Sequence, residues 1–252
     1  MMKNDMFSAQ SLPSNEDRQE TKVDYFDVNS LFIDTKKFCA NNGLTEQIFV
    51  SDIECEDSFD LINKDLREKV RKFNNSIFYL RNSLYSYIHY CKLWSESDEE
   101  TNKLLLNVWQ RYEARCVCCE IFMYVEKVKS LVRSILNLDP KKTEKNSDFM
   151  NALKECALSN NHVKEFYDEA ERYKINSSVR FINKVRNDEI HNESCLDNYT
   201  DRMEINHGQY LTINFTHAIQ NNELYNKIKN CLEALLRLKQ NLQKIIDNFV
   251  VE

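Results

Sequence analysis

The chain has 252 residues, of which 42% are hydrophobic and 29% charged, and this suits one large globular domain or two small ones. Only two glycines and two prolines occur, so few tight turns are expected, and Rossmann sheets, P-loops and β-sandwiches, which need glycines, are excluded. The formal net charge of −6 argues against a broad attraction to nucleic acid but allows a local basic cleft.

The first 22 residues are polar and lack periodicity, which predicts a disordered leader at residues 1–22 and a single helical domain at residues 23–252. Nine cysteines are present, and an odd number cannot all pair. The sequence lacks a signal peptide and an apolar run long enough to span a bilayer. We therefore expect free thiols, a cytoplasmic location and no membrane segment.

Two helices are expected next. A short one at residues 29–43 can be capped by Asn29 or Ser30 and stopped by Asn42-Gly43. A long one follows at residues 58–94. Its apolar residues recur at steps of three and four, which places them on one helical face: Ile62, Leu66, Val70, Phe73, Ile77, Leu80, Leu84, Ile88 and Cys91.

A second long helix is expected from about Asp98 to Leu138, ended by Asp139-Pro140. The residues predicted to face the core are Leu105, Trp109, Tyr112, Cys116, Cys119, Phe122, Leu131, Ile135 and Leu138. A shorter helix at 148–159 comes next. The helical segment after it can be broken in two at Asn176-Ser177-Ser178.

The pattern then alternates over residues 201–215, with His207-Gly208 in the middle, and this predicts a small β-hairpin. The last segment, residues 216–250, carries one apolar stripe: Leu224, Ile228, Cys231, Leu235, Leu238, Leu242, Ile245 and Phe249. The predicted fold is all-α, an up-and-down bundle of four long helices with additional short helices and one hairpin.

One hexapeptide, Arg-Asn-Asp-Glu-Ile-His at residues 186–191, has the groups for RNA scission without a metal. His191 can act as base or acid near neutral pH, and Arg186 can hold a phosphate with its bidentate fork. Asn187 can orient the scissile group or fix His191. Five residues span about 500° on a helix, so Arg186 and His191 project about 140° apart. A helix end, a π-type bulge or a second copy of the chain would bring both to one phosphate, and the geometry favours a cleft shared by two chains.

This hexapeptide resembles the Arg–polar–x–x–x–His signature of HEPN domains, with Asn187 in the polar position, and the resemblance covers at best residues 59–250. HEPN domains are helical bundles, often metal-independent endoribonucleases that act as toxins or phage-defence effectors. The resemblance implies that Arg186, Asn187 and His191 are the catalytic set, that RNA is the substrate and that the chain forms a homodimer. An antitoxin or regulatory protein is a further possible partner. No cofactor or metal is expected.

Other interpretations stay open. Arg186 and His191 can simply satisfy carbonyls at a helix end, and the chain can be a non-catalytic interaction or RNA-binding module. Lys174, Arg180 and Lys184 can form the walls of an RNA groove, with Tyr173 or Phe181 stacking on a base, or belong to a solvated face mixed with acids such as Glu169 and Glu171. The cysteines at positions 116, 118 and 119, with His89, suggest a metal site, but buried reduced thiols fit a bundle core better.

Overall fold

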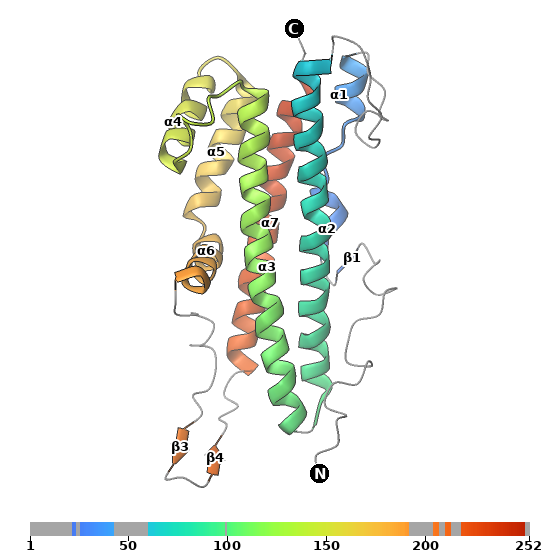
Figure 1. The fold of residues 1–252 in the computed structure, drawn as a ribbon, viewed down its shortest axis with the longest axis vertical. Helices are drawn as coiled ribbons and strands as arrows, with labels where there is room; N and C mark the ends of the chain where they lie inside the picture. The colour runs from blue at the N-terminus through green and yellow to red at the C-terminus, as the bar shows by residue number, and fades with distance from the viewer. Residues whose placement is uncertain are drawn as a thin grey trace.

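The computed structural model describes residues 22–23, 26–42, 60–98, 100–191, 204–206, 210–212 and 218–249. These residues form an all-α fold in which long helices run side by side along one axis (Figure 1). The predicted leader lies outside the described residues except for Lys22, which belongs to a short strand.

Three long helices make up most of the bundle: α2 (Asp60–Glu96), α3 (Glu100–Ile135) and α7 (Ala218–Asp247). α2 and α3 form an antiparallel hairpin, with Phe73 packed on Tyr124 at 4.7 Å between ring centroids and Tyr90 stacked on Trp109 at 5.9 Å. α7 lies behind this hairpin in Figure 1 and runs antiparallel to the shorter helix α5 (Asn161–Ile175). The up-and-down bundle predicted from the sequence is confirmed.

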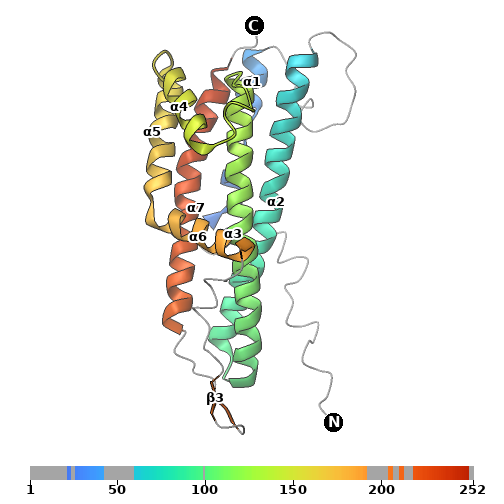
Figure 2. The same ribbon diagram turned by 60° about the vertical axis from the view of Figure 1, so that its left-hand side comes forward.

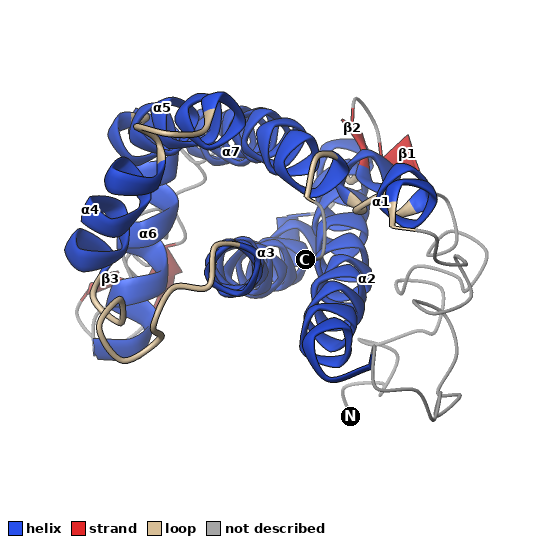
Figure 3. Cartoon of the chain, turned by 90° about the horizontal axis from the view of Figure 1, so that it is seen from above, coloured by secondary structure: helices blue, strands red, loops and turns tan. Residues whose placement is uncertain are grey.

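The predicted fourth long helix is two helices. α5 ends at Ile175, and α6 (Ser177–His191) begins two residues later. Figure 2 shows α6 running across α3 instead of continuing along the bundle axis. The break predicted at Asn176-Ser177-Ser178 is therefore correct. The small helix α4 (Asn146–Cys156) packs outside α5. Seen from above, it lies on the side of the molecule opposite α2 (Figure 3).

The core stripes of α2 and α7 agree with the sequence. Six residues of the α2 stripe from Leu66 to Leu84 and seven residues of the α7 stripe are buried, while Phe249, beyond α7, stacks on Phe38. The expected inner face of α3 is largely wrong, because Tyr112 is 54% exposed and Cys116, Cys119 and Phe122 are only half-buried. Leu131 and Ile135 are buried as predicted. The hydrophobic residues of α3 that are buried although they were not predicted are Ala114, Val117, Cys118, Ile121, Tyr124, Val128 and Val132.

The short helix expected at residues 29–43 is two elements, the 3-10 helix η4 (Val28–Leu31) and α1 (Lys36–Asn41). The cap of η4 is Asp27, which accepts a hydrogen bond from the amide of Asn29. The extended link between them is held from both sides, because the amide of Ile33 donates to Asn74 of α2 and that of Asp34 donates to Gln243 of α7, each at 3.0 Å. These contacts with residues distant in sequence hold the link extended, so the two short helices do not join into one continuous helix.

The described strands form two short antiparallel pairs. β3 (Glu204–Asn206) pairs with β4 (Tyr210–Thr212), which confirms the hairpin, but Asn206 faces Tyr210, so three residues rather than two connect the strands. The second pair, β1 (Lys22–Val23) with β2 (Phe26–Asp27), was not predicted.

The predicted C-terminal end of α3 needs correction. α3 ends at Ile135, before the Asp139-Pro140 stop, because Asn137 adopts a left-handed backbone with φ of 49° and the amide of Leu138 donates to the carbonyl of Arg133.

Within the described part of the chain, no helix is long and apolar enough to cross a membrane.

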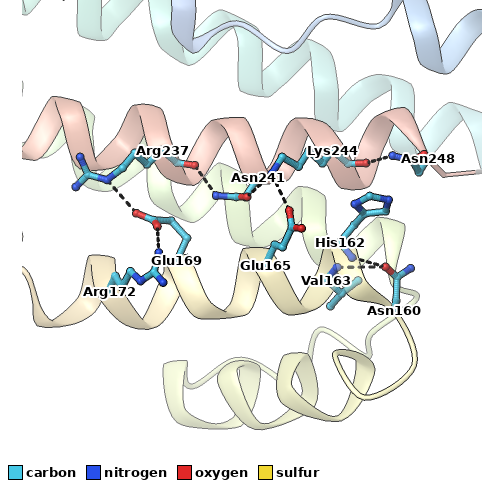
Figure 4. Close-up of polar contacts among 10 residues, drawn as sticks. All are labelled: Asn160, His162, Val163, Glu165, Glu169, Arg172, Arg237, Asn241, Lys244 and Asn248. Atoms are coloured by element: carbon cyan, nitrogen blue, oxygen red, sulfur yellow. Dashed lines mark hydrogen bonds and ion pairs between the residues drawn. The ribbon is translucent and has the colours of Figure 1, made fainter.

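One of the two alternatives from the sequence placed Glu169 on a solvated face, but its side chain is only 6% exposed between α5 and α7. One carboxylate oxygen accepts a hydrogen bond from Arg237 at 3.1 Å, and the other accepts one from Arg172 at 3.3 Å (Figure 4). A second pair, Lys244 with Glu165 at 2.7 Å, joins the same two helices nearer the solvent. The buried carboxylate therefore fixes the register of α5 against α7.

We predict that Glu169→Gln lowers the free energy of unfolding by about 1–2 kcal/mol, because a buried amide replaces the ionised acceptor of both arginines. The matched control is Glu171→Gln, whose carboxylate is 39% exposed and lies 3.7 Å from Lys174. This control should lose less than about 0.5 kcal/mol. Urea denaturation followed by circular dichroism measures both, and equal losses would contradict the role of Glu169.

Candidate functional site

The start of α6 is set by Asn176. Its side-chain oxygen accepts hydrogen bonds from the amides of Ser178 at 2.9 Å and Val179 at 3.2 Å, which satisfies two donors of the first turn. The helix then buries Val179, Ile182 and Val185 against the core. This apolar face determines how the remaining side chains of α6 are distributed.

The polar residues of α6 divide between two faces. Arg180, Lys184 and Asn187 are exposed, and at 100° per residue their positions and position 191 fall within about 60° of one another. Arg186 lies about 100° away from Asn187, at the edge of the buried face, and is half-buried. The helix therefore directs Arg186 toward α3, whereas Arg180, Lys184 and Asn187 are exposed to solvent.

Arg186 is held by two contacts. Its guanidinium carbon lies 3.9 Å from the centre of the Phe122 ring on α3, a cation–π stack. One terminal nitrogen donates a hydrogen bond of 2.8 Å to the side-chain oxygen of Asn187. Asn187 thus contacts Arg186, a partner that sequence reasoning did not assign to it. This bond uses one of the five donors of the guanidinium, and a bidentate contact with phosphate needs two others.

His191 is the last residue of α6, and its side chain lies outside the described part of the chain. α6 is a continuous α-helix up to this position. The predicted angle of about 140° between positions 186 and 191 therefore applies, and the two positions face different directions within one chain.

The three lysine and arginine residues expected in an RNA groove surround the junction of α5 and α6. Lys174 pairs with Glu171 at 3.7 Å, and the side chain of Arg180 donates a hydrogen bond of 3.4 Å to the backbone carbonyl of Lys174. Lys184 is exposed one turn after Arg180. All three are accessible, but they are spread over the junction, and only Lys174 borders the cavity described next.

A cavity of about 310 Å³ lies between α3, α4, α5, α6 and α7. Buried side chains such as Val128, Phe166 and Leu238 line its inner part, while exposed residues such as Lys174 and Asn187 line its mouth. The cavity therefore opens beside the Arg186–Asn187 pair. Sequence reasoning missed it, because its walls come from five helices that are distant in the chain.

The two aromatic residues expected to stack on a base are not on an open surface. Tyr173 is 8% exposed, and its hydroxyl lies 4.0 Å from the sulfur of Cys231, but the residue forms part of the cavity wall. Phe181 is half-buried and packs against the core. Burial also raises the pKa of the Cys231 thiol to about 12, so that sulfur stays protonated.

The cysteines of α3 do not gather around a metal. Cys118 is buried, Cys116 and Cys119 are half-buried, and burial is the main reason why the pKa of Cys116 is raised. Among the residues that the structure describes, no group of three or more His, Cys, Asp or Glu side chains is placed to hold a metal ion.

Comparisons of the chain with protein-family models, with curated proteins and with solved structures found no match. The assignment to the HEPN family therefore stays a prediction that depends on residues 186–191 and on the helical architecture.

Proposed function

We propose that the chain is a metal-independent endoribonuclease that acts as a toxin or phage-defence effector. The observation that carries this proposal is the fixed guanidinium of Arg186, which is held by Phe122 and Asn187 five residues before α6 ends at His191. A phosphoryl transition state needs a restrained cation, which Arg186 provides, and a titratable group, which His191 would provide.

In the proposed reaction, a base removes the proton of a ribose 2′-hydroxyl, and the 2′-oxygen attacks the adjacent phosphorus. The bond from phosphorus to the 5′-oxygen breaks, and an acid gives that oxygen a proton. His191 supplies base or acid catalysis, and Arg186 stabilises the charge on the phosphorane-like transition state. Asn187 keeps Arg186 in position through the hydrogen bond of 2.8 Å.

We also propose that two chains build one cleft, so that one His191 acts as base and the other as acid. The angle of about 140° between positions 186 and 191 supports this arrangement, because a single α6 cannot direct both at one phosphate.

The first prediction concerns the products. Purified protein in EDTA should cut RNA and leave a 2′,3′-cyclic phosphate and a 5′-hydroxyl, because the nucleophile belongs to the substrate. His191→Ala should abolish the cut while the circular dichroism spectrum and thermal unfolding stay unchanged. A substrate with 2′-deoxyribose at the cleavage position should resist. Binding of RNA without any cleavage would instead favour a non-catalytic RNA-binding or interaction module.

A second prediction concerns Arg186→Lys, which should lower kcat/KM about 100-fold, because an ammonium keeps the charge but lacks the planar fork that stacks on Phe122 and contacts phosphate. The control is Arg71→Lys, an exposed position on α2 that lies away from α6. Full cleavage by Arg186→Lys would remove Arg186 from this role.

The third prediction tests the shared cleft. Wild-type chains are mixed with a growing excess of His191→Ala chains, allowed to exchange subunits, and assayed for activity per wild-type chain. This activity should fall as mutant chains replace wild-type partners. A constant value, or a monomer by light scattering at the assay concentration, would reject the dimeric site.

A further inference from the structure

The cavity beside Arg186 has the size and composition of a ligand site. Its volume of about 310 Å³ lies at the lower end of the range for small-molecule pockets, roughly 300–1,000 Å³. A space of this size takes one nucleotide-sized molecule and not an oligomer. The cavity runs from exposed residues at the mouth to fully buried ones at its inner end, so a ligand can enter from solvent.

The walls favour a flat ring. Four aromatic side chains from three helices line the cavity, and they are Phe122 of α3, Phe149 of α4, and Phe166 and Tyr173 of α5. Such walls bind a planar aromatic group by stacking and by burial of its apolar faces. Aliphatic side chains of α3, α6 and α7 close the inner end.

The mouth favours a ring with a polar edge. Asn146, Asn183 and Asn187 are exposed and line the cavity. Each carboxamide offers both a donor and an acceptor, the pair of groups that reads the edge of a nucleobase. A purely apolar ring would gain no hydrogen bond from these amides.

The charges near the mouth favour an anion outside the ring. Lys129 and Lys174 line the cavity, and Arg186 lies on the Phe122 ring that forms part of its wall. Two carboxylates are close to these cations. Glu126 itself lines the cavity and pairs with Lys129 at 2.7 Å, and Glu171 lies 3.7 Å from Lys174. A phosphate at the mouth would therefore meet mainly Arg186, with the two lysines nearby.

We propose that this cavity binds a nucleobase, with the attached phosphate at Arg186. The nucleobase belongs either to a free nucleotide or to one residue of an RNA strand, and the second source rests on the proposed function. Binding requires neither His191 nor cleavage, so it is measured on the full chain carrying His191→Ala.

The experiment is isothermal titration calorimetry with AMP, GMP, CMP and UMP, and with trinucleotides of each base. At least one mononucleotide should bind with a Kd below about 1 mM. A trinucleotide that binds at least 10-fold more tightly than its mononucleotide identifies RNA as the source, and equal affinities identify the free nucleotide. Indole is a ring of similar size with one polar N–H group and no phosphate, and it should bind more weakly than the preferred nucleotide.

Two substitutions tie the binding to the cavity. Ala170→Phe fills the space from α5 and should weaken binding at least 10-fold. Asn183→Ala removes one amide at the exposed mouth, where folding is little affected, and should weaken binding about 5-fold. Asn151→Ala, the same change at an exposed position of α4 that does not line the cavity, should leave the Kd unchanged.

Three results would overturn the proposal: no binding by any nucleotide, indole binding as tightly as the best nucleotide, or an affinity that neither Ala170→Phe nor Asn183→Ala lowers. The outcomes also separate the two proposals. If the protein binds nucleotides but never cleaves RNA, the cavity proposal stands and the ribonuclease proposal is rejected. If it cleaves RNA but binds no nucleotide, the ribonuclease proposal stands and the cavity proposal is rejected.

Discussion

The break at Asn176 is the constraint on which the candidate site depends. Its extended backbone, with φ of −60° and ψ of 127°, ends α5, and its side chain caps α6 at once. A continuous helix would carry residues 177–191 along the bundle axis. Because the chain turns here, α6 crosses α3 (Figure 2), Arg186 reaches Phe122, and the space between α5 and α6 is left partly open as the cavity.

Side-chain hydrogen bonds like those of Asn176 stabilise other turns of the chain in place of glycine. Both glycines of the chain, Gly43 and Gly208, lie outside the described residues, so the described turns are made without them. Short polar side chains stabilise these turns by accepting hydrogen bonds from backbone amides two residues ahead. Besides Asn176, the residues that do so are Asp27, Asp34, Asp139 and Asn160. The low glycine count therefore does not mean few changes of direction.

The sequence was most informative where one helical face is apolar, as in α2 and α7, and least informative where several faces are. Tyr112 and Phe122 follow a helical period in α3, but the residues of α3 that are buried lie mainly on a different face of the helix. Glu169 could not be placed as a buried residue, because its partner Arg237 is 68 residues away. The motif at 186–191 and the break at Asn176 are local and were found, whereas the cavity requires the relative positions of five helices.

The net charge of −6 limits how the proposed site can attract RNA. The electrostatic field of the whole molecule would repel a polyanion at long range. Binding therefore has to come from short-range contacts that persist at physiological salt concentration. Stacking in an aromatic cavity is such a contact, since it depends little on ionic strength. A base held there and a phosphate at Arg186 would be fixed by one rigid wall, because Phe122 belongs both to the cavity and to the stack under the guanidinium. The two proposals are thus physically linked through Phe122, although each can fail without the other.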